Sequence, residues 1–281
     1  MNSSLLLSIV TFVYGAAAAL YLAAWIFKRA LPGKLASALV VIAVVGNLGG
    51  ILLRWWESHQ LGFGHVPLAN LYESLIFFSV MTAGIYLVVE GRYKNRVIGA
   101  FALPLVFLAM AYASLSPVVS DRIQPLVPAL KSNWLIVHVI TCFVGYASFA
   151  VAFGVSTMYL AKQRAAGAGG DLLARFPSGE VLDELNYQLI LFGFVFLTAG
   201  IITGAVWANS AWGRYWGWDP KETWSLITWF VYATLLHARM MRGWSGKRVA
   251  FLSIAGFMAV LFTYFGVNFL PGLHSYGAMG Q

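Results

Sequence analysis

Long apolar runs dominate this sequence and restrict the chain to one class of fold. Eight of them reach about 18 residues or more, the length at which an α-helix crosses the core of a bilayer. Only 10% of the 281 residues are charged, too few to cover a soluble domain of this size. We expect an all-α polytopic membrane protein with about eight transmembrane helices, residues 1–281 forming a single integral membrane domain. The predicted spans are residues 4–27, 36–56, 71–90, 97–115, 134–161, 185–207, 222–241 and 248–270.

Basic residues alternate between the connecting loops. Thirteen of the 18 lysines and arginines lie in or beside the loops that follow the first, third, fifth and seventh predicted spans. The positive-inside rule places these loops in the cytoplasm and both termini on the outer side of the membrane. The longest inner connection, residues 162–184, has the composition of a flexible cytoplasmic linker. The net charge of +8 therefore reflects membrane topology, and we expect no nucleic-acid partner.

Tryptophan is concentrated in one predicted outer loop, residues 208–224. Six of the chain's 11 tryptophans lie within residues 207–229, where WGRYWGWDPKETWSLITW begins at position 212. Interfacial tryptophans are common in membrane proteins, but a general aromatic belt is distributed over many spans. Crowded aromatic rings separated by glycine, aspartate and proline could instead hold a large flat apolar ligand with a polar edge, such as haem. The candidate contact residues are Trp212, Tyr215, Trp216, Trp218, Asp219, Pro220, Lys221, Glu222 and Trp224.

Two histidines are predicted on the same membrane face as this loop. His138 lies one turn into the fifth span, and His274 follows the eighth span in the outer tail. Neutral imidazoles on the two faces of a porphyrin would give a six-coordinate iron. Considered singly, each histidine is better explained as an interfacial residue hydrogen-bonded to water or backbone. Their shared position beside the aromatic loop favours a ligand role for the pair.

His237 lies at a different depth. It is fifteen residues beyond Glu222, roughly 22 Å along a helix at about 1.5 Å per residue. An ionisable group inside a span suggests a functional site, but His237 could equally lie in the inner headgroup layer beside Arg239 and Arg242. No other histidine of this chain is predicted at that depth, so a second axial ligand would come from a partner chain or be weak.

The remaining polar candidates have weaker patterns. His59 and His65 lie in an outer loop, and we expect both to be solvated. Glu73, just inside the third span, could hydrogen-bond another loop or orient a ligand histidine. Cys142 is the only cysteine, so the chain forms no internal disulfide, and we expect a small packing residue there. The sequence has no GxxxxGK[ST], HExxH or paired CxxC motif and gives no indication of ATP hydrolysis.

Taken together, these residues resemble the haem-handling family of cytochrome c biogenesis proteins, in particular the CcsA or ResC type of the system II cytochrome c synthase. The resemblance rests on the tryptophan-rich "WWD" segment, with PLANLYES at residues 67–74 and GVNFLPGLHSYG at residues 266–277. The flanking His138 and His274 support it, and it covers essentially the whole chain.

The resemblance implies roles for single residues. His138 and His274 would be the two outer axial ligands of haem at the WWD segment, and His237 would be a membrane-embedded ligand for haem that enters from the cytoplasmic side. The second embedded ligand would come from a CcsB- or ResB-type membrane subunit, and this chain lacks the corresponding segment. Alone, the chain would therefore be half of a synthase.

The resemblance also implies an activity. A cytochrome c haem-lyase (synthase) subunit would move haem b across a bacterial cytoplasmic (inner) membrane. It would present haem on the periplasmic side for thioether attachment to the CxxCH motif of an apocytochrome c, whose cysteines a thiol-reducing protein keeps reduced. The chain would position haem, and no side chain is expected to act as a general acid or base.

Four other interpretations predict different outcomes. A haem transporter or chaperone would bind haem without ligation activity of its own. An electron-transfer cytochrome would hold permanent haems between histidine pairs at matching depths, whereas this chain has one deep histidine. A structural membrane protein with an aromatic belt would bind no haem. A related WWD family serves a different biogenesis system, and the PKETWSLITW continuation favours the CcsA type instead.

Overall fold

The computed structural model describes residues 2–164 and 172–270, and the described residues contain helices and no strand. Eight long helices match the eight predicted spans one to one, so the predicted all-α class is confirmed. The helices are α1 (Ser3–Phe27), α2 (Ala30–Gln60), α3 (Leu71–Tyr93), α4 (Gly99–Leu115), α5 (Asn133–Arg164), α6 (Gly179–Trp212), α7 (Pro220–Arg242) and α8 (Lys247–Tyr264). Short 3₁₀ turns are η1 (Arg96–Ile98), η2 (Pro128–Leu130), η3 (Leu173–Arg175) and η4 (Gly266–Phe269).

Seven described helices are long and apolar enough to cross a membrane, and α7 is the exception. Polar residues occupy both ends of α7, from Lys221 to Arg242, and they shorten its apolar stretch. The longest helix, α6, has 34 residues, about 51 Å at ~1.5 Å per residue. Because a bilayer core is ~30 Å thick, α6 is longer than the hydrocarbon layer that a membrane span has to cross.

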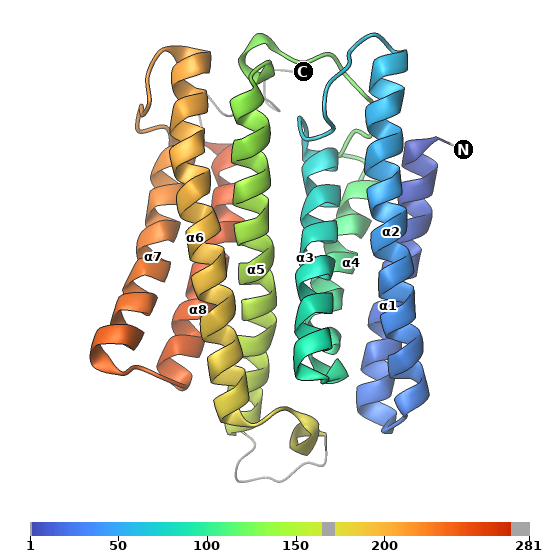
Figure 1. The fold of residues 1–281 in the computed structure, drawn as a ribbon, viewed down its shortest axis with the longest axis vertical. Coiled ribbons are helices and arrows are strands. Elements are labelled where there is room, and N and C mark those ends of the chain that lie inside the picture. Colours follow the sequence, from blue (N-terminus) through green and yellow to red (C-terminus); the bar gives the residue numbers. More distant parts are fainter. Residues whose placement is uncertain (1, 165–171, 271–281) are drawn as a thin grey trace. The chain divides into compact units, whose positions relative to one another are not determined.

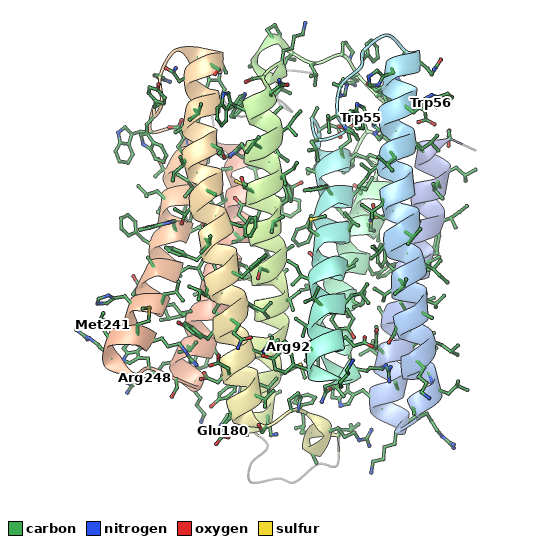
Figure 2. The ribbon with its side chains drawn as sticks, viewed as in Figure 1. Trp55, Trp56, Arg92, Glu180, Met241 and Arg248 are labelled. Atoms are coloured by element: carbon green, nitrogen blue, oxygen red, sulfur yellow. The ribbon has the colours of Figure 1, made fainter. Side chains whose placement is uncertain are left out.

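The described residues group into two compact units. Residues 1–127 and 161–178 belong to unit 1, in which α1 packs on α2 and α4, and α3 packs on α4 and α2 (Figure 1). Its interior contains fully buried tyrosines, among them Tyr21 and Tyr86, whereas Val45 and Leu52 on α2 are exposed. This distribution is typical of helices in lipid, where apolar side chains face the acyl chains. Figure 2 shows Trp55 and Trp56 near one end of unit 1 and Arg92 near the other.

A buried ion pair joins α2 to the start of α3 inside unit 1. Arg54 Nε donates to Glu73 Oε1 at 2.8 Å, and both side chains are almost completely buried. The second carboxylate oxygen accepts the Ala69 amide at 2.8 Å. The guanidinium also lies 4.9 Å from the centre of the Tyr72 ring. An ion pair that is removed from water must satisfy its partners by such contacts, and this one fixes the loop before α3 against α2.

Unit 2 comprises residues 128–160 and 179–281, of which the described part contains α5 to α8. Within it, α6 contacts α7 and α8, and α7 contacts α8. The α6–α7 connection lies at the same end of this unit as the beginning of α5 (Figure 1). Glu180, Met241 and Arg248 lie at its opposite end (Figure 2). The tryptophan-rich segment and the basic α7–α8 turn therefore occupy opposite ends of one helical unit.

The predicted inner linker is shorter in the structure than residues 162–184. Helix α5 continues to Arg164, and α6 begins at Gly179. Between them lies η3. The two residues after η3, Phe176 and Pro177, accept hydrogen bonds from the Lys162 ammonium through their carbonyl oxygens. Residues 165–171 lie outside the described part of the chain. The described ends of this connection are thus helical or hydrogen-bonded.

Candidate functional site

His138 lies in the second turn of α5, and its ring packs against α6. Its Nδ1 lies 2.8 Å from the carbonyl oxygen of Gly200. A carbonyl can only accept, so Nδ1 carries the proton in this contact and the neutral ring has its lone pair on Nε2. The Trp207 indole stacks with the imidazole, with ring centroids 5.8 Å apart and planes 16° apart. Backbone partners of this kind fix the tautomer and orientation of metal-binding histidines.

Glycines on α6 allow this close approach. Gly193, Gly200 and Gly204 are spaced seven and four residues apart, which places them on one face of the helix. A Cβ atom at Gly204 would lie 2.7 Å from Nδ1 of His138, and one at Gly200 would lie 2.5 Å from Sγ of Cys142. The α5–α6 seam therefore has no space for larger side chains at these positions. Cys142 is buried in the seam, and its predicted packing role is confirmed.

Two tryptophans connect His138 to the α6–α7 loop. Trp207 is buried, and its indole N–H donates to the carbonyl of Ala129 at 2.9 Å. The Trp212 ring packs edge-on against it, with centroids 4.9 Å apart and planes at 60°. Trp212 is the last residue of α6. A continuous line of rings thus runs from the imidazole to the helix end where the loop begins.

The tryptophan-rich loop contains fewer non-helical residues than the predicted segment 208–224. Helix α6 ends at Trp212 and α7 begins at Pro220, so residues 213–219 alone connect them. Asp219 is the N-cap of α7, and its side chain accepts the amide of Lys221 at 2.9 Å. Pro220 takes the first helical position, where the absent N–H is not needed. The DPKE sequence therefore forms the helix start itself.

Glu222 stabilises the turn around Trp218. Its Oε2 accepts the amides of Gly217 at 2.7 Å and Asp219 at 3.1 Å, one on each side of Trp218. Trp218 has a φ of +56°, a left-handed conformation that is uncommon for a residue other than glycine. Its indole is 69% exposed, and Trp216 packs edge-on against it at 5.7 Å. One half-buried carboxylate oxygen thus supports a turn that displays an aromatic ring at the protein surface.

The remaining candidates border the same turn. Tyr215 is exposed. Nζ of Lys221 donates to Oδ1 of Asn268 at 3.3 Å, which ties the start of α7 to η4. Burial lowers the pKa of the Lys221 ammonium, which precedes the predicted span 222–241. Trp224 packs against α8, where its ring lies 4.1 Å from that of Phe262.

His237 lies on the outer face of α7, far from the other candidates. Its side chain is exposed, and Ile227, Phe230 and Met241 on the same helix are exposed as well. Their spacing of three, seven and four residues places all four on one stripe. The imidazole therefore points away from the helices packed around α7. Its role as an iron ligand stays a prediction.

The remaining histidine predictions concern His59, His65 and His274. His274 lies outside the described residues. His59 is exposed, as predicted, but it lies in the last turn of α2 and not in the following loop. His65 is buried, so the prediction of a solvated side chain was wrong; its Nε2 lies 2.9 Å from the carbonyl oxygen of Gln124 and joins two loops of unit 1. Glu73 belongs to the ion pair of unit 1 and makes no described contact with a histidine.

The sequence patterns did not identify three residues of the site. Gly200 and Gly204 were counted only as part of an apolar span, and Trp207 only as one of several tryptophans. The spacing of the glycines along one face of α6 was the pattern that could have indicated a close contact with the neighbouring helix that contains His138. Which face of α5 meets those glycines depends on tertiary packing, which a single sequence does not specify.

Comparison with known proteins identifies the family of this chain. Residues 68–274 match the family model described as Cytochrome C assembly protein. The matched range includes His138, the tryptophan-rich segment and His237, and it covers more than half of the chain. The chain belongs to the cytochrome c assembly family. The family match implies haem handling in cytochrome c maturation and confirms the resemblance found in the sequence.

Individual relatives support the family assignment over nearly the full length. A cytochrome c biogenesis protein CcsA from Parasynechococcus marenigrum (strain WH8102) is 40% identical over 286 residues, covering 92% of each chain. The CcsA protein of Gloeobacter violaceus (strain ATCC 29082 / PCC 7421) is 39% identical over 339 residues, covering 99% of this chain and 98% of the relative. That of Heterosigma akashiwo (strain NIES-293 / 8280G21-1) is 42% identical over 266 residues, covering 82% of this chain and 83% of the relative.

A solved structure shares the fold of this cytochrome c assembly protein. Cytochrome c Heme Lyase CcmF aligns with a TM-score of 0.71 at 20% sequence identity. The alignment covers 94% of this chain and 47% of CcmF. At this identity the similarity establishes a shared helical architecture. The eight-helix arrangement is therefore found within a longer protein as well.

Proposed function

We propose that this chain is the haem-presenting subunit of a system II cytochrome c synthase. In this role it moves haem b to the outer face of a bacterial cytoplasmic membrane and holds it for thioether attachment to the CxxCH motif of apocytochrome c. The observation that carries the proposal is the hydrogen bond from His138 Nδ1 to Gly200, because it leaves the iron-binding lone pair on Nε2.

The α6–α7 turn supplies the other features that a porphyrin needs. Haem is a flat apolar ring with two carboxylates at one edge, and the exposed indole of Trp218 offers an apolar surface beside the loop. Because Asp219 and Glu222 accept backbone amides in the turn, we assign them to positioning rather than to direct contact with haem. We propose His274 as the second axial ligand, on the basis of the family resemblance.

A second haem position is proposed at His237. The imidazole lies on an exposed stripe of α7, and in this proposal a CcsB- or ResB-type subunit packs against that stripe and supplies the opposing ligand. The sequence has no other histidine at that depth, so a complete site requires the partner. This arrangement would receive haem from the cytoplasmic side before it reaches the outer site.

The attachment reaction requires positioning more than proton transfer. Each cysteine thiol of the acceptor adds across one vinyl group of haem: sulfur forms the new C–S bond and the thiol proton ends on the vinyl carbon. A thiol-reducing protein keeps those cysteines reduced. Holding haem and acceptor in one orientation replaces a bimolecular encounter by an effectively intramolecular step. Bis-imidazole ligation would keep the iron low-spin until the acceptor's histidine replaces a ligand.

Haem spectra of the purified protein with its partner test the proposal. We expect the wild type to show a six-coordinate low-spin spectrum, and His138→Ala to lose the outer component of that spectrum. His59→Ala is the matched control, because His59 is exposed in unit 1 and its loss should leave the spectrum unchanged. An unaltered spectrum in His138→Ala would exclude this residue as an iron ligand.

The product distinguishes the synthase from a haem transporter without ligation activity. Apocytochrome c carrying CxxCH is supplied with the protein and its partner, and covalent haem is detected by haem staining after denaturation. Thioether product that depends on His138 supports the synthase. Transfer of haem that remains extractable by acid solvent supports the transporter instead.

A further inference from the structure

A cavity lies at one end of unit 1, and no residue assigned to haem lines it. It has a volume of about 170 Å³ and is bordered by the end of α1, the start of α2 and the α3–α4 connection. A single water needs roughly 15 Å³ of cavity, so this space can hold a group of several heavy atoms. Three cations line it: Arg29, Lys94 and Arg96.

One carboxylate lies beside these cations, and hydrogen bonds already occupy it. Glu90 accepts the hydroxyl groups of Tyr21 and Tyr86 at 2.6 Å each, and the hydroxyl of Ser37 as well. Its Oε1 also accepts Nε of Arg96 at 3.1 Å. Glu90 therefore compensates one of the three cations and has little capacity for the others. The cavity keeps a surplus of positive charge.

Arg96 is held in a fixed orientation at the cavity wall. Its Nε donates to Ser37 Oγ at 3.0 Å as well as to Glu90. Its aliphatic stem lies over Gly33 on α2, where a Cβ atom would come within 3.0 Å of Cδ. Both of these hydrogen bonds to described residues are donated by Nε of the guanidinium. The planar fork of terminal N–H groups matches the oxygens of a phosphate.

The start of α2 adds to the preference for an anion. Ala30 and Gly33, in its first turn, line the cavity. The N-cap residue Arg29 makes no side-chain hydrogen bond to the helix. The first amides of an α-helix carry a partial positive charge and favour anions. Cations and backbone thus act in the same direction at this cavity.

We propose that this cavity binds the phosphate group of an anionic lipid. Trp25 borders it, and tryptophan at a helix end lies at headgroup depth. Its indole N–H donates to the carbonyl of Leu172 at 2.9 Å, which fixes the ring at the cavity wall. Basic pockets between transmembrane helices bind lipid headgroups in this way. A soluble phosphate has the same chemistry and is the competing source of the ligand.

Lipid retention by the intact purified protein tests the site. The wild type, the double variant Arg29→Gln/Lys94→Gln and the control Lys34→Gln/Arg92→Gln are placed in nanodiscs of phosphatidylcholine mixed with phosphatidylglycerol. Both doubles remove one arginine and one lysine, and neither Lys34 nor Arg92 lines the cavity. Arg96 is left intact because it pairs with buried Glu90.

Phosphatidylglycerol retained after detergent extraction is counted by native mass spectrometry. We expect the cavity variant to retain less phosphatidylglycerol than the control double, on the order of 30-fold, because two cations worth about 1 kcal/mol each are lost from the cavity. Equal retention in the two doubles, or no retained lipid in the wild type, would overturn the proposal. Inorganic phosphate is titrated in a parallel arm. If it displaces the lipid at about millimolar concentration or binds in its absence, the ligand is a soluble phosphate and the lipid assignment fails.

Discussion

The absence of one side chain at position 204 decides where the imidazole of His138 lies. Gly204 allows the ring to rest on α6, and the Gly200 carbonyl then accepts Nδ1–H. Trp207 closes the other side of the ring by stacking. Gly200, Gly204 and Trp207 have no side chain that binds a metal, yet together they determine which nitrogen of His138 is available to one. At the scale of single residues, the site depends on backbone shape as much as on the ligand.

The substitution Gly204→Ala should reduce haem affinity without unfolding the protein. The new Cβ would lie 2.7 Å from Nδ1, so the ring must move and its bond to Gly200 must lengthen. Loss of a partner that orients a metal-binding histidine costs roughly 10- to 100-fold in affinity. Haem titration followed by absorbance measures the loss, and thermal unfolding measures stability.

Gly84→Ala is the matched control for this change. Gly84 lies in α3, and a Cβ there would meet nothing within 4 Å. Alanine is favoured over glycine inside a helix by about 1 kcal/mol, so the control should keep its haem affinity and its stability. Equal haem affinity in the two variants would show that Gly204 has no role in orienting the ring.

At the scale of elements, the α6–α7 junction acts as one hydrogen-bonded unit. Asp219 and Glu222 form a capping box at the start of α7, and the Glu222 carboxylate also holds the amide of Gly217. The same atoms that start the helix therefore hold Trp218 in its left-handed conformation. Helix capping and display of the aromatic ring cannot be changed independently.

Glu222→Ala should release the Trp218 turn. Two amides lose their acceptor, and a lost cap costs about 1 kcal/mol of stability. We expect faster proteolysis within residues 213–219 and weaker haem binding. Glu222→Gln keeps a side-chain oxygen that accepts the same amides, so it should stay close to wild type. If the alanine and glutamine variants are both cleaved as slowly as the wild type, the hydrogen bonds that the Glu222 side chain accepts do not stabilise the turn.

The sequence predicted the elements better than their contacts. The eight apolar runs specify eight helices because each must satisfy its own backbone in lipid. Within the tryptophan-rich segment, composition outweighed a local signal in the sequence: Asp219 and Pro220 mark the start of α7. His65 could not be placed from local patterns, since its buried contact is with Gln124, 59 residues away.

At the scale of the whole molecule, the distribution of basic residues predicts which ends of the helices face the cytoplasm. Single cysteines at Ser210 and Ser245 test this in a Cys142→Ala background. Both serines are exposed, they lie towards opposite ends of α7 in the chain, and serine to cysteine changes no charge. We expect a membrane-impermeant maleimide to label position 210 in cells with a permeabilised outer membrane, and position 245 only after the cytoplasmic membrane is opened.

The wild-type chain is the control for this labelling. Its single cysteine, Cys142, is buried and should stay unlabelled under both conditions. The reverse pattern, with position 245 labelled first, would place the tryptophan-rich loop in the cytoplasm. An outer site for haem attachment would then be excluded.

The ion pair between Arg54 and Glu73 bears on how unit 1 is made. The two residues are 19 positions apart, so at roughly 5–20 residues per second the carboxylate leaves the ribosome about one to four seconds after the guanidinium. A lone arginine costs about 2.5–3.5 kcal/mol during insertion at the centre of a span and less near its end, where Arg54 lies. Helix α2 consequently enters the bilayer most favourably together with α3, as a hairpin whose charges are already paired.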